Sequence, residues 1–174
     1  VKKLVKNDEI LIPAICWSTS LWPIIQSGLK VKFVDIDLKT LNIDIDDLKR
    51  KISKKTKALM LVHAMGNCTN MNELVKLCKK NKIILIEDTC EALGSTFNKK
   101  PLGTFGDFSS YSFYYSHHIT SGEGGMICFK KKKYNDILKS LRSHGWSKNL
   151  SNSKNLEKKH SNIDKNWIFI NSGF

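Results

Sequence analysis

The residue types best suited to chemistry gather in two short segments of the chain. In the first, Glu87-Asp88 directly follows the apolar run Ile83-Ile84-Leu85-Ile86. A carboxylate placed at the end of a buried strand is held by the sheet, so Asp88 suits a fixed cationic partner such as a protonated ring nitrogen. The alternative is that Asp88 caps a following helix. The spacing alone supports both interpretations equally.

The second segment is the histidine pair His117-His118, which follows the aromatic and hydroxyl-rich run 112–116. Adjacent residues on an extended chain face opposite ways, so at most one of the two imidazoles enters a given pocket. This argues against a metal site built on both histidines. A neutral imidazole takes and returns a proton near pH 7, which makes one of them a candidate acid/base. The blander alternative, which the spacing alone favours, is two surface or hydrogen-bonded histidines.

Trp17 follows the first apolar run, Glu9 to Pro13. A flat indole at that place could stack on an aromatic cofactor, although a tryptophan in the core is the more common case. The turn Gly122-Glu123-Gly124-Gly125 lacks the glycine order of known phosphate-binding loops and predicts no site by itself.

Apolar runs and amphipathic segments alternate along the chain, and these elements must position the candidate residues. The expected strands cover residues 9–13, 31–36, 58–62, 83–86, 108–113 and 126–129, and the expected helices cover 18–27, 44–52, 71–80 and 134–143. The alternation predicts an α/β fold with a mostly parallel sheet. Ligands of such sheets bind outside the carboxyl ends of the strands, which is where Trp17, His63, Asp88 and the segment around His117 are expected.

Composition narrows the class of protein. The 174 residues carry a formal net charge of +13, and all but two of the 29 basic residues are lysines. The lysine clusters have no interleaved aromatic residues, so we expect no nucleic-acid partner. Five scattered cysteines without a CxxC pair indicate reduced thiols in a cytoplasmic protein, with no disulfide framework and no zinc site.

The apolar runs and the chain ends carry further expectations. No apolar run approaches the roughly 20 residues that span a bilayer, so we expect no membrane partner. The start has no signal-peptide pattern. The chain begins without Met and stops without a tail, and we therefore expect it to be a piece of a longer one.

Five stretches in order resemble the sugar aminotransferases of the DegT/DnrJ/EryC1/StrS family, a group of fold-type I enzymes that use pyridoxal 5'-phosphate (PLP). They are IPAICWSTSLWPIIQSGLKVKFVDID, ALMLVHAMGN, IEDTCEALGSTFNKKPLGTFGDFSSYSF, YYSHHITSGEGGM and LRSHGW. Together they cover the chain to about residue 146. The resemblance implies that residues 1–146 are part of the PLP-binding large domain and that 147–174 are a polar connection toward a C-terminal small domain.

One position departs from the family pattern. Ordinary members carry the lysine that binds PLP covalently where this chain has His117. The departure resembles the 3-dehydratase branch, which removes the C3 hydroxyl of a nucleotide-linked 4-keto-6-deoxy sugar. A CDP-glucose type of this branch also holds an iron–sulfur cluster on four cysteines. Cys90 matches the first of them, but no cysteine lies between Lys148 and Lys158. The match therefore favours the GDP-mannose type, and the segment from Arg142 to Trp146 agrees.

The resemblance also implies a role for each matching residue. Trp17 is expected to stack on the cofactor ring, Asp88 to pair with the ring nitrogen, Glu91 to lie near the ring and Ser112 to bind the cofactor phosphate. His117 is expected to be the catalytic acid/base, with pyridoxamine 5'-phosphate bound non-covalently and glutamate as the amino donor. Family members are usually homodimers, and the branch serves deoxysugar and lipopolysaccharide O-antigen biosynthesis.

Two alternatives remain at this point. If another lysine reaches PLP, the protein is a nucleotide-sugar aminotransferase. If the piece is degenerate, it is an inactive truncated module that binds a partner through its lysines.

Overall fold

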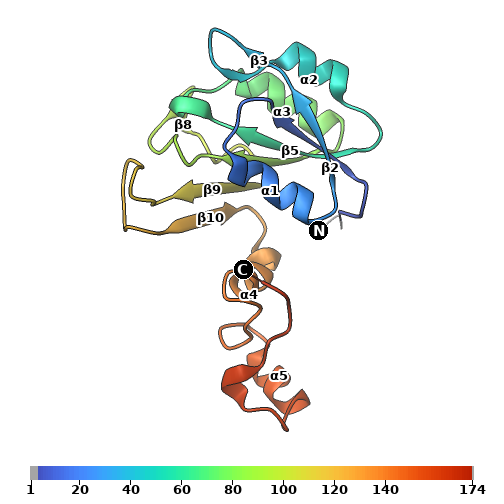
Figure 1. Cartoon of the computed structure of the whole chain (residues 1–174), viewed down its shortest axis with the longest axis vertical. Helices are drawn as coiled ribbons and strands as arrows, with labels where there is room; N and C mark the ends of the chain where they lie inside the picture. Colours follow the sequence, from blue (N-terminus) through green and yellow to red (C-terminus); the bar gives the residue numbers. More distant parts are fainter. Residues whose placement is uncertain (1–3, 174) are drawn as a thin grey trace. The chain divides into compact units, whose positions relative to one another are not determined.

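The computed structural model describes residues 4–173, and the chain divides into two compact units, Val1–Cys128 and Phe129–Phe174 (Figure 1). The division predicted at residue 146 concerns the domains of the intact protein and stays a prediction. No helix among the described residues is long and apolar enough to cross a membrane.

The first unit is built around a sheet of six strands in the order β10-β9-β6-β5-β1-β2. Its strands are β1 (Glu9–Pro13), β2 (Lys30–Val34), β5 (Thr56–Val62), β6 (Ile84–Asp88), β9 (Phe108–Ser112) and β10 (Gly125–Phe129). The neighbours from β9 to β2 pair in parallel. The arrow of β10 runs opposite to that of β9 (Figure 1). The predicted α/β fold with a mostly parallel sheet is therefore confirmed.

Three helices and two small hairpins complete the first unit. The helices are α1 (Ser18–Gln26), α2 (Ile45–Lys51) and α3 (Met71–Lys80), with a short 3-10 turn η1 (Ala64–Gly66). The hairpins pair β3 (Ile36–Asp37) with β4 (Asn42–Ile43) and β7 (Thr96–Phe97) with β8 (Lys100–Pro101).

Alternate residues of the central strands enter two separate apolar clusters, one on each face of the sheet. Leu59, Leu61 and Leu85 pack with residues of α2 and α3. Ala58 and Met60, one position along, pack with Ile24 of α1. Side chains of a strand alternate between faces, so this pattern assigns a face to every residue of β5 and β6. Glu87 lies on the face of α2 and α3, and Asp88 on the face of α1.

Local signals in the sequence explain where the helices begin and end. The Asn70 side chain accepts a hydrogen bond from the Glu73 N–H at 3.2 Å and caps α3, which covers the predicted residues 71–80. The Asp44 side chain caps α2 in the same way through the N–H of Asp47. Gly28 takes a positive φ of 69° just after α1, where glycine avoids the steric cost of a side chain.

Two of the predicted strands end two residues away from the observed carboxyl ends. The strand expected over 31–36 ends at Val34, because the N–H of Asp35 donates to the carboxylate of Asp47 and leaves the sheet ladder. The strand expected to end at residue 86 continues to Asp88. That extension arises because Asp88 pairs with Val62 on one side and with Ser110 on the other.

The second unit is small and mostly irregular. It contains η2 (Lys132–Tyr134), α4 (Asn135–Leu141), α5 (Ser153–Lys159) and η3 (Lys165–Trp167). Trp146 anchors it, since its indole N–H donates to the Asn166 carbonyl at 2.8 Å and its backbone bridges to Phe169. The polar stretch 147–174 thus contains one short α-helix, α5, and the 3-10 turn η3.

Candidate functional site

Asp88 presents a carboxylate with a fixed orientation at the carboxyl end of β6. Its Oδ2 accepts a 2.6 Å hydrogen bond from the hydroxyl of Ser20 in the first turn of α1. Its Oδ1 accepts from the Cys90 N–H at 3.1 Å. The helix-capping alternative is wrong, since Asp88 caps a turn and no helix follows it. Each oxygen of a carboxylate has two acceptor sites, so Asp88 can still accept a proton-bearing ring nitrogen.

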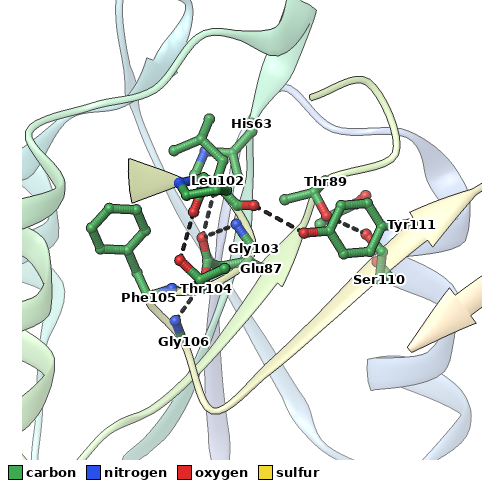
Figure 2. A network of polar contacts seen from close by, with 12 residues as sticks. His63, Glu87, Thr89, Leu102, Gly103, Thr104, Phe105, Gly106, Ser110 and Tyr111 are labelled. Atoms are coloured by element: carbon green, nitrogen blue, oxygen red, sulfur yellow. Dashed lines mark hydrogen bonds and ion pairs between the residues drawn. The ribbon is translucent and has the colours of Figure 1, made fainter. Parts of the chain in front are cut away.

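The neighbouring acid, Glu87, is fully buried and surrounded by donors (Figure 2). Its Oε1 accepts from the N–H groups of Phe105 and Gly106 at 2.8 and 2.5 Å. Its Oε2 accepts from the Gly103 N–H at 2.8 Å and lies 3.0 Å from Nε2 of His63. Burial alone would raise the pKa of Glu87, but the hydrogen bonds from His63 and the backbone outweigh it and hold that pKa below its ordinary value.

The position of His63 differs from the one expected at the carboxyl ends of the strands. It follows β5 as predicted, but its side chain is only 1 % exposed and is directed at Glu87. It lies on the face of the sheet opposite to that of Asp88. His63 is therefore part of the buried network around Glu87 and does not lie with Asp88 on the other face.

The end of β9 carries Ser112 and leads into the segment that contains His117. Asp88 pairs with Ser110, so the side chains of Ser110 and Ser112 lie on the same face as Asp88. The Ser112 Oγ accepts from the N–H of Tyr114 at 3.2 Å. The Tyr114 ring meets the His117 ring edge-on, with centroids 6.1 Å apart. Ser112 and His117 are thus connected through a single aromatic residue.

The two histidines have different environments. His118 is exposed, whereas His117 is half-buried. The Nδ1 atom of His117 is buried and has no hydrogen-bond partner among residues 4–173. A buried polar atom without a partner is uncommon and calls for an explanation, and Nδ1 of His63 shares this state. This geometry distinguishes His117 from the two-surface-histidine alternative.

Trp17 and Glu91 lie on loops at the same carboxyl edge of the sheet. Trp17 immediately precedes α1, and its side chain is 75 % exposed, which excludes the alternative of a core tryptophan. Its helix is tied to Asp88 through Ser20. Glu91 is exposed, and its Oε2 accepts from the Met65 N–H at 2.9 Å. The roles expected for both residues toward a cofactor stay predictions.

Cys90 lies beside the carboxylate of Asp88. Burial, followed by the hydrogen bond and negative charge of Asp88, raises the pKa of the Cys90 thiol to about 12. It therefore stays protonated at neutral pH, unlike a thiolate ligand. Within residues 4–173, no group of His, Cys, Asp and Glu side chains could hold a metal ion.

The second unit has a hollow of its own, of about 560 Å³. Cationic and aromatic side chains line it, with the exposed indole of Trp167 among them. The lining residues are Arg142, Ser143, His144, Trp146, Lys148, Asn166, Trp167 and Phe169.

Sequence reasoning missed three sets of contacts near the carboxyl ends of β6 and β9. Ser20 is 68 residues from Asp88 in the sequence, and nothing in its helical segment signals the contact. Glu87 was expected beside Asp88, but not the donors that surround it. Tyr111 donates its hydroxyl to the Leu102 carbonyl at 2.9 Å, and only its position in an alternating strand could have indicated an inward side chain.

The chain is similar to known proteins of one family. Residues 1–166 match the DegT/DnrJ/EryC1/StrS aminotransferase family. The chain is 43 % identical over 174 residues to GDP-4-keto-6-deoxy-D-mannose 3-dehydratase of Escherichia coli O55:H7 and covers 45 % of that protein. It thus spans less than half the length of this curated relative.

Solved structures give the same result. The E. coli GDP-4-keto-6-deoxy-D-mannose 3-dehydratase with bound hydrated PLP has a TM-score of 0.89 and 43 % identity, over all of this chain and 46 % of that one. A GDP-4-keto-6-deoxymannose 3-dehydratase with a trapped PLP–glutamate geminal diamine has a TM-score of 0.85 and 41 % identity, over 98 % of this chain and 45 % of that one. The fold, the order of the motifs and these similarities together show that the chain belongs to the DegT/DnrJ/EryC1/StrS aminotransferase family.

Proposed function

We propose that the intact protein removes the C3 hydroxyl of a GDP-linked 4-keto-6-deoxy sugar, with PLP in its amine form as cofactor and glutamate as amino donor. The observation that carries the proposal is His117, a half-buried imidazole with an unpartnered Nδ1 where aminotransferases of this family have lysine. The relatives named above, which bear a dehydratase name and include structures with PLP, support it.

The residues present fit this cofactor. Asp88 offers carboxylate capacity beyond its two observed hydrogen bonds, which suits a protonated ring nitrogen. Trp17 offers an exposed flat indole for stacking. Ser112 has a hydroxyl on the same face as Asp88 for the phosphate, and Glu91 follows in the loop after β6. When bound, the cofactor supplies an amino group and a ring that accepts electrons.

The protein's own part in the reaction rests on holding and moving protons. Asp88, fixed by Ser20 and Cys90, keeps the ring nitrogen protonated. His117 cannot form the covalent link that lysine forms, so its imidazole remains available as a base. Once protonated, it can deliver a proton to the C3 oxygen of the sugar, so that the hydroxyl group leaves as water. The cations and indoles of the hollow in the second unit suit a nucleoside diphosphate.

We also propose that the intact protein is a cytoplasmic homodimer. The loops at the carboxyl ends of β5 and β9 expose Met65, Tyr115 and Ile119, which a second copy would cover. The five cysteines among the described residues form no disulfide, which suits a reducing compartment. Sedimentation of the purified intact protein gives its mass directly, and a monomer at micromolar concentration would contradict the dimer.

The test of the function is product analysis of the purified intact protein with PLP, glutamate and either GDP- or CDP-linked 4-keto-6-deoxy sugars. We expect a 3-deoxy-4-keto product from the GDP sugar. His117→Asn should keep the absorbance of bound PLP but lower turnover by about 10²–10⁴-fold. His118→Asn is the matched control and should remain active. An amino sugar as the only product, or full turnover by His117→Asn, would identify a different reaction.

A further inference from the structure

We propose that Glu87 is a positioning residue for the cofactor site, acting from the opposite face of the sheet through Tyr111. The proposal rests on the proposed function only for what the site binds. The buried Glu87 carboxylate fixes the turn at residues 102–106, and this turn holds the end of β9 in place. The end of β9 carries Ser112 and leads to His117.

All acceptor sites of the Glu87 carboxylate are occupied by donors. Glu87 and His63 are 0 % and 1 % exposed, and the carboxylate accepts from three backbone N–H groups within four residues of chain, Gly103 to Gly106. A carboxylate has about four acceptor sites, and here His63 takes the remaining one. Without this acceptor the three N–H groups would be left without a partner in the interior. The conformation of the turn therefore depends on Glu87.

The turn at residues 102–106 is in direct contact with β9 through Tyr111. The Tyr111 hydroxyl donates to the carbonyl of Leu102, the residue before Gly103 (Figure 2). Gly103 has a φ of 84°, and a Cβ on it would overlap with that hydroxyl, so the turn and the tyrosine are closely packed. A shift of the turn must move Tyr111 with it.

Successive side chains of β9 point to opposite faces of the sheet. Tyr111 lies on the face of Glu87, and its two neighbours, Ser110 and Ser112, lie on the face of Asp88. Ser110 is also held by Thr89, whose hydroxyl donates to the Ser110 carbonyl at 2.5 Å. A strand end pinned on one face by Tyr111 thus presents Ser112 on the other. The two adjacent acids thus act on opposite faces of the sheet: Glu87 stabilises the strand ends, and Asp88 is available to the ligand.

Glu87→Gln in the cofactor-free intact protein tests the proposal. Whichever way the new amide turns, its NH2 group faces at least one backbone N–H that now has no acceptor. We expect amide hydrogen exchange to rise about tenfold or more both in residues 103–106 and, across the tyrosine contact, in residues 110–114. In the same variant, titration of the PLP absorbance should show roughly tenfold weaker binding, because a misplacement of about 1 Å is costly in a preorganised site.

Asp47→Asn is the matched control. Asp47 is also a buried carboxylate that accepts a backbone N–H and faces cations, but it lies on α2 beside Asp35. It should lower stability without changing exchange at 110–114 or the affinity for PLP. The proposal is overturned if Glu87→Gln speeds exchange at 103–106 alone, or if Asp47→Asn gives the same pattern.

A second variant keeps the proposal testable if Glu87→Gln does not fold. Tyr111→Phe removes only the hydroxyl that joins β9 to Leu102, and it should speed exchange at 110–114 while leaving the Glu87 contacts in place. Unchanged exchange there would overturn the proposal. Failure of the wild-type protein to bind PLP would instead refute the proposed function, and the exchange measurements would still decide the role of Glu87.

Discussion

Glu87 and Asp88 are adjacent acids at the end of one strand, yet they have opposite surroundings. Glu87 is fully buried and saturated by donors from His63 and the 103–106 turn. Asp88 is half-buried, and its hydrogen bonds with Ser20 and Cys90 leave acceptor capacity on both oxygens. A carboxylate whose acceptor sites are all used stabilises the groups around it. A carboxylate that is held in place but has free acceptor sites can still accept a hydrogen bond from a ligand.

The largest effect should come from removing the saturated acid. Glu87→Ala leaves three backbone N–H groups and His63 buried without an acceptor, and it should cost about 3–5 kcal/mol of folding free energy. Urea unfolding of the intact protein measures this loss. A cost below about 1 kcal/mol would show that the Glu87 network is dispensable and would remove the contrast with Asp88.

Replacing Asp88 should affect activity and spare stability. Asn at position 88 can accept from the Cys90 N–H on its oxygen and donate from its NH2 group to the Ser20 hydroxyl, but it cannot keep a ring nitrogen protonated. We expect Asp88→Asn to lower turnover on the order of 10²–10³-fold, in the range for loss of a preorganised electrostatic group. Steady-state kinetics and urea unfolding of the same preparation separate the two effects. Equal loss of stability and activity would contradict the assignment.

The contribution of Glu87 to folding stability should depend on pH. The pKa of Glu87 is lowered from its ordinary value of 4.5 in the folded state, so the unfolded chain binds more protons as pH falls through that region. The stability that the Glu87 charge contributes is thus fully present above about pH 4.5 and is lost as pH falls further below it. Urea unfolding of wild type and Glu87→Gln at pH 7 and pH 4 measures this. The difference between them should shrink at the lower pH, and a constant difference would refute the contribution of the charge.

The smallest effect is expected at Trp17. Its side chain is 75 % exposed, so Trp17→Ala should change the folding free energy by no more than about 0.5 kcal/mol. Loss of stacking should weaken PLP binding by about 1 kcal/mol, or roughly fivefold in Kd. Absorbance titration of PLP checks this. Trp22, which lies in α1, is 52 % exposed, and Trp22→Ala should leave the affinity unchanged.

Much of the fold could be predicted because its signals are local. The spacing of Leu74 and Leu77 predicts α3 with the observed bounds. The apolar run from Ala58 predicts a central strand, and β5 lies between β6 and β1. Strand ends were less accurate, because they depend on partners elsewhere in the chain. Asp47 removes Asp35 from the sheet, and Ser110 holds Asp88 in it.

The sequence by itself determined the α/β class, the family pattern and the place of His117 after the last parallel strand, because periodicity and motif order are properties of consecutive residues. Only the tertiary structure decided which of the two acids is saturated by donors and which keeps acceptor capacity. Ser20 reaches Asp88 from 68 residues away, and the donors of Glu87 come from a loop 16 to 19 residues farther along. The physical reason is that alternation places adjacent side chains on opposite faces, while the groups that meet them are brought there by packing of distant elements.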